Sequence, residues 1–144
     1  MNSQLEAAFN AVTDVTDSLS IRFESKCESD RFLLFANGVT LKNIDDDIRL
    51  EFSVNDGGGC IFRAVFDKTK PSRKVLKLIN AFNEDCLFFN AYIRTDRKNR
   101  YLTLRHFTIW DTADELASFA RETVSRFVDL SDDKLFRKIT KYTK

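Results

Sequence analysis

The sequence predicts an α+β protein: a helix, a three-stranded antiparallel meander, a second helix, a two-stranded hairpin and a third helix. Two observations support this order. Apolar residues recur at helical spacing in three stretches, and they alternate with polar residues in the segments between. The 144 residues are expected to form a single domain, 1–144, large enough to bury a core without a metal or disulfide. With 14 Phe and one Trp, that core should be rich in phenylalanine.

The first half of the chain is predicted to hold one helix and three strands. From Leu5 to Leu19 apolar residues recur every three or four positions, which places them on one face of a helix. The apolar run Phe32–Phe35 predicts a short strand that ends at the turn signal Asn37-Gly38. Strict alternation from Asp47 to Val54 predicts a half-buried strand.

The glycine cluster Gly57-Gly58-Gly59 is predicted to turn this strand into the next one, Cys60–Asp67, as an antiparallel hairpin. The cluster lies between two strands and no Lys-Ser or Lys-Thr follows it, so it does not indicate a phosphate-binding loop. Asp45-Asp46-Asp47 lacks the carboxylate spacing of a calcium loop and is interpreted as a solvated turn.

The second half predicts a helix, a hairpin and a helix. Pro71 and Ser72 are suited to open a helix that ends near Asp85. Leu87–Arg94 and Tyr101–Ile109 alternate as strands, and the short polar segment between them allows only antiparallel pairing. Thr112 and Glu115 have capping-box spacing at the start of the last long helix, and Ser131 is expected to cap a short helical tail.

The sequence favours neither an enzyme nor a protein with a cofactor or metal. Its one histidine, His106, lies inside a predicted strand with no nearby serine or cysteine motif, and a structural role is expected for it. Cys27, Cys60 and Cys86 are widely spaced and match neither a disulfide framework nor a zinc site. The N-terminus shows no leader pattern and no segment is long enough to cross a bilayer, so a cytoplasmic location is expected, without membrane contact.

Charge is divided unevenly along the chain. Acidic residues outnumber basic ones in residues 1–56, and basic residues outnumber acidic ones afterwards, although the net charge is +1. The two halves could form complementary solvated faces of one domain. They could also favour self-association or an acidic partner.

The preferred function is binding of another polypeptide, whose identity the sequence does not give. A second copy of this chain, in a homodimer, is one such partner. Two of the predicted strands carry apolar residues on both sides, and such a sheet is either covered twice by helices or offers a surface to another chain. The expected contact residues are Phe88, Tyr92, Ile61 and Val65.

The alternative is a small nucleic-acid-binding protein that uses the hairpin around residues 94–105. Arginines and aromatic rings together could contact phosphates and stack on bases. The residues involved would be Arg94, Arg97, Lys98, Arg100 and Arg105, although charged side chains at a hairpin tip also keep a strand edge soluble. The near-neutral net charge makes nucleic acid the less favoured partner.

The segment from residue 72 to 128 resembles the YbjN-like family, whose fold is shared with type III secretion chaperones. The similar residues are Leu78-Ile79-Asn80-Ala81-Phe82-Asn83, Leu87-Phe88-Phe89-Asn90-Ala91-Tyr92 and Tyr101-Leu102-Thr103-Leu104. The resemblance implies a non-enzymatic domain without a cofactor that binds polypeptides or acts in regulation, often as a dimer. It supplies no catalytic residue. Asn80 and Asn83 are expected to tie the last turn of their helix to the loop before the fourth strand.

Overall fold

The computed structural model describes residues 1–142, and these contain four α-helices and one six-stranded antiparallel sheet. The predicted α+β class is therefore confirmed. The strands run side by side in the order β1-β2-β3-β4-β6-β5. The elements, in chain order, are α1 (Ser3–Asp17), β1 (Glu24–Cys27), β2 (Arg31–Leu41), β3 (Ile44–Asn55), β4 (Gly59–Lys68), α2 (Arg73–Asp85), β5 (Asn90–Asp96), β6 (Asn99–Ile109), α3 (Ala113–Asp129), the 3₁₀ turn η1 (Leu130–Asp132) and α4 (Lys134–Tyr142).

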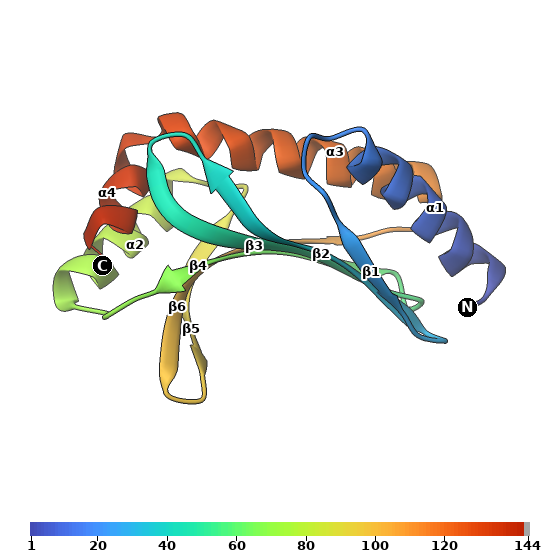
Figure 1. Ribbon diagram of the computed structural model, residues 1–144, viewed down its shortest axis with the longest axis horizontal. Coiled ribbons are helices and arrows are strands. Elements are labelled where there is room, and N and C mark those ends of the chain that lie inside the picture. The colour runs from blue at the N-terminus through green and yellow to red at the C-terminus, as the bar shows by residue number, and fades with distance from the viewer. Residues whose placement is uncertain (143–144) are drawn as a thin grey trace.

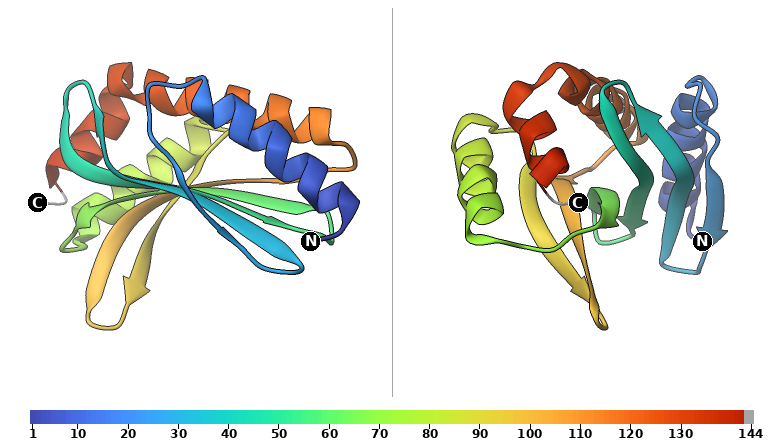
Figure 2. Two further views of the ribbon diagram at one scale, coloured as in Figure 1. Left: turned by 45° about the vertical axis from the view of Figure 1, so that its right-hand side comes forward. Right: turned by 60° about the vertical axis from the view of Figure 1, so that its left-hand side comes forward.

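The molecule has two layers. All four helices lie on one side of the sheet, and the β5–β6 hairpin projects from the other side (Figures 1 and 2). Along β3 and β4 alternate residues are buried, as the sequence pattern predicts, because successive side chains of a strand point to opposite faces. The buried set faces the helices.

Phenylalanine rings form the centre of the core between the layers. The Phe62 ring, fully buried on β4, lies 5.1 Å from that of Phe52 and 6.1 Å from that of Phe127, measured between centroids. A second group joins Phe66 and Phe82 to Phe136 of α4, at 5.2 and 5.3 Å. Edge-on and tilted ring pairs of this kind add to the stabilisation from buried area alone.

The N-terminus of each long helix is capped by a side chain. Asn2, Ser72 and Thr112 accept hydrogen bonds from the backbone N–H three residues further on. These bonds satisfy backbone donors that have no partner within the helix. At α3 the predicted Thr112–Glu115 bond forms, but the return bond to the Glu115 carboxylate comes from the Asp111 N–H, at 3.3 Å, and not from that of Thr112. The predicted cap at Ser131 is wrong: Ser131 lies in η1, and the Asp133 carboxylate accepts from the Phe136 N–H of α4 at 2.8 Å.

Two predicted turns are wrong. Asn37-Gly38 does not end a strand, because β2 continues through this pair as a bulge in which Gly38 has φ +66°. The chain turns instead before Ile44, with Asn43 at φ +66°. The Asp45–Asp47 segment is not a solvated turn either: it belongs to β3, whose alternation buries Asp46. The Asp46 carboxylate accepts a hydrogen bond from the Asp67 N–H at 3.2 Å.

The glycine cluster makes the predicted hairpin turn between β3 and β4. Gly58 adopts φ +89°, a conformation that side-chain-bearing residues rarely take. A Cβ at this position would also lie 3.1 Å from the Trp110 carbonyl oxygen, so the close approach of the turn to the end of β6 needs glycine. The sheet gains one strand that the sequence did not predict, the short and fully exposed β1.

The strand predicted at Leu87–Arg94 is β5, and it begins at Asn90 rather than at Leu87. Leu87 and Phe88 precede it, and Phe88 turns towards the helices, where its ring stacks on that of His106. Asn83 of α2 fixes the start of β5. Its amide nitrogen donates to the Ala91 carbonyl at 2.9 Å, and its amide oxygen accepts from the Ala91 N–H at 2.7 Å. The predicted tie is therefore present for Asn83, whereas Asn80 is exposed.

Changing Asn83 to Leu should lower the free energy of unfolding by about 1–2 kcal/mol, because two partly buried backbone groups of Ala91 lose their partner. Urea denaturation measures this difference. The matched control is Asn80→Leu on the exposed side of the same helix, which should change stability by about 0.5 kcal/mol or less. Equal losses in the two variants would contradict this role for Asn83.

Candidate functional site

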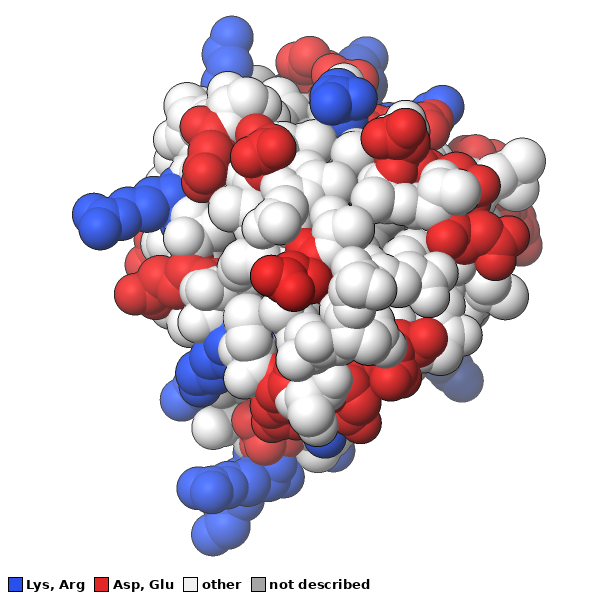
Figure 3. Space-filling view, turned by 90° about the vertical axis from the view of Figure 1, so that its right-hand side faces the viewer, with Lys and Arg blue, Asp and Glu red and all other residues white. Residues whose placement is uncertain are grey.

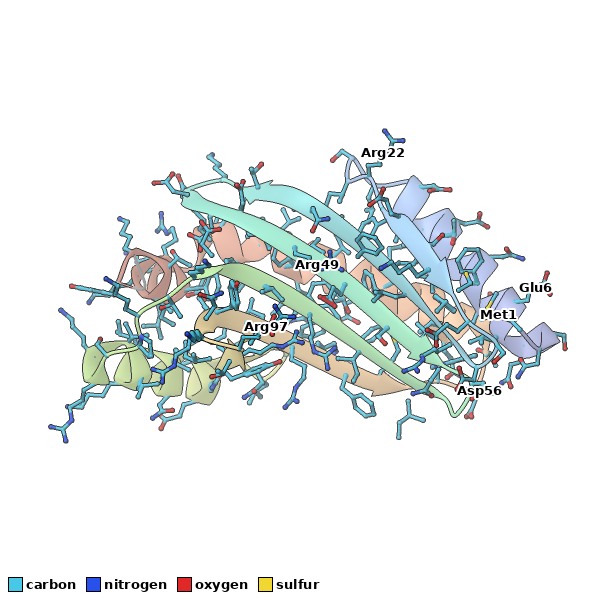
Figure 4. All side chains as sticks on the ribbon, turned by 60° about the horizontal axis from the view of Figure 1, so that its bottom comes forward. Met1, Glu6, Arg22, Arg49, Asp56 and Arg97 are labelled. Atoms are coloured by element: carbon cyan, nitrogen blue, oxygen red, sulfur yellow. The ribbon has the colours of Figure 1, made fainter. Side chains whose placement is uncertain are left out.

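Among residues 1–142 no helix lies over one face of the sheet, and we call this the open face. Figure 4 looks onto it, with Arg49 of β3 near its middle and Arg97 over the β5–β6 hairpin. The strand register aligns its side chains in rows that cross the sheet. Ile61 lies opposite Phe107, and Arg63 lies opposite Arg105.

The row through Ile61 is apolar on β4 and β6 and exposed at its β6 end. On the other side it continues through Ser53 of β3 to Leu33 of β2. At the β6 end Phe107 is 53% exposed, and Ile109, two residues along β6, is 72% exposed. Large apolar side chains that are exposed next to one another are a feature typical of interaction sites.

The neighbouring row places two arginines directly opposite each other. Like charges at opposed positions of an antiparallel pair repel. Among residues 1–142 neither Arg63 nor Arg105 forms an ion pair. Glu51 lies across from Arg63 on β3, but its carboxylate is held by the Arg49 guanidinium at 3.1 Å. The Arg105 guanidinium lies 5.3 Å from the centre of the Tyr92 ring.

A hollow of about 890 Å³ occupies the end of the open face beside the hairpin. Residues of β3, β4, β5 and β6 line it, among them Val65 and Tyr101. Its charged side chains have both signs: Arg49, Lys68, Arg94, Asp47, Glu51, Asp67 and Asp96. The hollow can therefore accept polar groups, but it does not concentrate one charge.

Of the four residues predicted to contact a partner, the structure brings three together on the open face. Ile61 and Val65 alternate with the buried residues of β4, and Tyr92 is paired with Thr103, the neighbour of Val65. Phe88 is not with them, because it lies before β5 and faces the helices. Sequence analysis missed Phe107 and Arg63, although the alternation in Tyr101–Ile109 would have placed Phe107 beside Ile61 once the β4–β6 pairing was known.

The basic cluster predicted for nucleic acid is divided between two sides of the hairpin. Arg94 and Arg105 lie on the open face. Arg100 is paired with Thr95 and so points the other way, where it lines a hollow of about 550 Å³ with Lys98. Arg97 forms the tight turn, with φ +56°. The five side chains therefore do not make one continuous basic surface.

Acidic side chains also lie elsewhere on the molecule. Figure 3 shows the end that carries the start of α1, where Asp and Glu are scattered among uncharged residues and Lys and Arg lie mainly towards the margin.

His106 is packed between two aromatic rings on the helix-covered side. Its ring lies 3.8 Å from that of Phe88 and 5.1 Å from that of Phe119, between centroids. The Arg126 guanidinium lies over the outer side of Phe88, at 4.7 Å. Burial lowers the pKa of His106 below its ordinary 6.5, against opposing contributions from a backbone hydrogen bond with Phe88 and from Glu122.

The stability of the protein should fall as the pH falls through about 6.5, because the unfolded chain protonates His106 more readily than the folded chain does. Unfolding by urea at about pH 7.5 and about pH 5.5 measures this effect. In His106→Phe, which keeps an aromatic ring between its neighbours, the difference between the two pH values should be smaller. An unchanged difference would show that other groups cause it.

The described residues, 1–142, contain no group of three or more side chains placed to hold a metal ion. Within the same residues no helix is both long and apolar enough to span a membrane.

One of the comparisons with known proteins, the comparison with solved structures, bears on the fold. No protein-family model matches the sequence, and no curated protein is similar to it. Among solved structures, the chain is similar to YbjN from E. coli, described as a proposed transcription regulator. The TM-score is 0.56, with 18% sequence identity over 85% of this chain and 87% of that chain. The YbjN-like fold implied by the sequence resemblance is therefore confirmed.

Proposed function

We propose that the chain is a non-enzymatic domain that binds another polypeptide on the open face. The observation that carries this proposal is the opposed pair Arg63 and Arg105, which has no carboxylate of its own, next to the exposed apolar row of Ile61 and Phe107. Such a surface is complementary to a segment that carries an Asp or Glu beside apolar side chains.

The arginine pair suits a carboxylate for geometric reasons. A guanidinium presents its donors in a planar fork that matches the two oxygens of a carboxylate. One carboxylate between Arg63 and Arg105 would relieve their repulsion and accept hydrogen bonds from both. The desolvation of these groups by neighbouring apolar contacts strengthens the interaction, because it lowers the local dielectric.

A polypeptide suits the open face better than a nucleic acid does. A nucleic-acid strand carries a phosphate at every nucleotide and needs a continuous basic track. The basic residues of the open face are interrupted by the carboxylates of Asp47, Asp67 and Asp96. Arg94 and Arg105 of the predicted basic cluster lie on this face, whereas Lys98 and Arg100 line a hollow on the other side of the hairpin.

The absence of a role in catalysis is part of the proposal, and His106 supports it. A structural histidine is held in place by packing, and the His106 ring is stacked between those of Phe88 and Phe119. The described fold of YbjN, a proposed transcription regulator, is compatible with a binding role but does not identify the partner.

Fluorescence anisotropy with defined probes tests the proposal. A labelled peptide that alternates leucine and glutamate should bind, and the same peptide with glutamine in place of glutamate should bind at least about tenfold more weakly. A labelled oligothymidine is the rival probe. If the oligothymidine binds and the acidic peptide does not, and if Arg97→Ala and Lys98→Ala abolish that binding, the domain is a nucleic-acid-binding protein instead.

A further inference from the structure

Strand β6 is longer than the strand that pairs with its outer side. It spans Asn99–Ile109, but its pairing with β5 stops at Arg105, which lies opposite Asn90. From residue 106 to 109 it has β4 on one side, and none of the strands in the described part of the chain lies on the other. We call this stretch the free edge.

The backbone groups of Phe107 and Ile109 point out of the sheet at the free edge. The Trp110 N–H donates to the Gly58 carbonyl at 2.7 Å, which shows that residue 110 is bonded towards β4. In an antiparallel pair the bonded positions alternate, so the backbone of Phe107 and Ile109 points away from β4. Among residues 1–142 their only outward hydrogen bond is a local one, from the Thr108 hydroxyl to the Ile109 carbonyl at 3.3 Å.

The other edges of the sheet are less available. On β5, the outward N–H and carbonyl of Ala91 are both bonded to Asn83. At the opposite end of the sheet the edge strand is β1, which has only four residues. Proteins commonly prevent unwanted strand pairing by keeping edge strands short, or by bonding side chains to the backbone N–H and carbonyl groups at the edge. The free edge of β6 lacks such protection and instead presents Phe107 and Ile109.

The two sides of the free edge differ in chemistry. On the open-face side, the exposed side chains are Phe107 and Ile109. On the helix side, His106 and Thr108 border a hollow of about 550 Å³ whose other wall is α3. Three carboxylates line that wall, namely those of Asp114, Glu115 and Glu122. No lysine or arginine lines this hollow among the residues that the structure describes, although Arg126 pairs with Glu122 at 3.2 Å.

We propose that the free edge accepts an extended segment of another protein as an additional strand, and that this segment alternates apolar and basic residues. Its backbone would bond with that of Phe107 and Ile109. Since successive side chains of a strand point to opposite faces, its apolar residues would cover Phe107 and Ile109, and its Lys or Arg residues would enter the acidic hollow beside Asp114. This site shares Phe107 with the open-face surface, but it uses neither Arg63 nor Arg105 and so does not depend on the proposed function.

Hydrogen exchange of the free protein tests the first step. The amides of Phe107 and Ile109 should exchange at least about tenfold faster than those of His106 and Thr108, which are bonded to β4. Addition of a peptide that alternates valine and lysine should slow the exchange of Phe107 and Ile109. Protection of all four amides in the free monomer would overturn the proposal, because the edge would then already be closed.

Peptide binding to variants tests the second step. The valine–lysine peptide should bind, and a valine–glutamate peptide should not. Ile109→Pro removes one outward N–H that the sheet does not use, and it should weaken binding at least about tenfold, whereas Ile109→Val should have little effect. Asp114→Asn removes one carboxylate from the hollow and leaves the strand edge intact. It should weaken binding of the valine–lysine peptide, so the proposal can still be tested if the proline variant does not fold.

Arg63→Gln separates the two sites. It should leave binding of the valine–lysine peptide unchanged, even if the leucine–glutamate peptide of the proposed function fails to bind at all. Concentration-dependent dimerisation that Ile109→Pro abolishes would overturn the proposal, since the free edge would then pair with a second copy of this chain. Equal binding of the lysine and glutamate peptides would also overturn it.

Discussion

Replacing Phe62 with alanine should lower the free energy of unfolding by about 3–5 kcal/mol, the largest loss expected from one substitution in this protein. The ring is fully buried and contacts Phe52, Phe89 and Phe127. It therefore joins the sheet to α3 and to the start of β5. Removing it leaves a cavity between the two layers that their backbones cannot close.

Guanidinium denaturation of Phe62→Ala measures this loss, with Phe107→Ala as its control. Phe107 lies on the neighbouring strand but is 53% exposed, so its removal should cost about 1 kcal/mol or less. If the two variants lose the same stability, Phe62 is not at the centre of the core.

Replacing both Arg63 and Arg105 with glutamine should weaken binding of the leucine–glutamate peptide by about 30-fold or more, because a buried charge-assisted contact is worth about 2–5 kcal/mol. Stability should be unchanged or slightly higher, since the repulsion between opposed arginines is about 0.2–1 kcal/mol and is removed at the same time. A loss of binding without a loss of stability distinguishes a contact residue from a structural one.

Arg97→Gln is the matched control for this double variant, because it removes an arginine from the hairpin tip and leaves the sheet face intact. Its binding of the peptide should equal that of the wild type. Should the double variant unfold more easily and still bind the peptide, the arginines support the fold and the carboxylate proposal fails.

Hydrophobic spacing was enough to predict most of the fold. The alternation in Asp47–Val54 and the capping residues Ser72 and Thr112 are local signals, and each acts within its own element. The phenylalanine core could be predicted from composition, because burying apolar aromatic surface is the main contribution that favours folding of a chain with 14 Phe.

The errors lie where a tertiary contact overrides the local signal. Asn37-Gly38 is a strong turn sequence, yet β3 pairs with β2 on both sides of it, and the pair becomes a bulge. Phe88 fits a strand by spacing, but its ring gains more by stacking on His106, a residue 18 positions away in sequence.

The candidate site was only partly predictable for the same reason. Ile61, Val65 and Tyr92 could be recognised as a second apolar face from alternation alone. The opposition of Arg63 and Arg105 depends on β4 pairing with β6, although α2 and β5 separate these strands in sequence. The free edge depends on the different lengths of β5 and β6, and strand ends are the features that local patterns define least well.

The most direct test of a peptide-binding open face is an NMR titration of ¹⁵N-labelled protein with the leucine–glutamate peptide. The account predicts that the largest amide shift changes map to Ile61, Arg63 and Phe107 on β4 and β6, while the amides of α1 and α2 stay in place. Changes confined to the hairpin tip at Arg97 and Lys98, or spread over the helix layer and absent from β4, would contradict it.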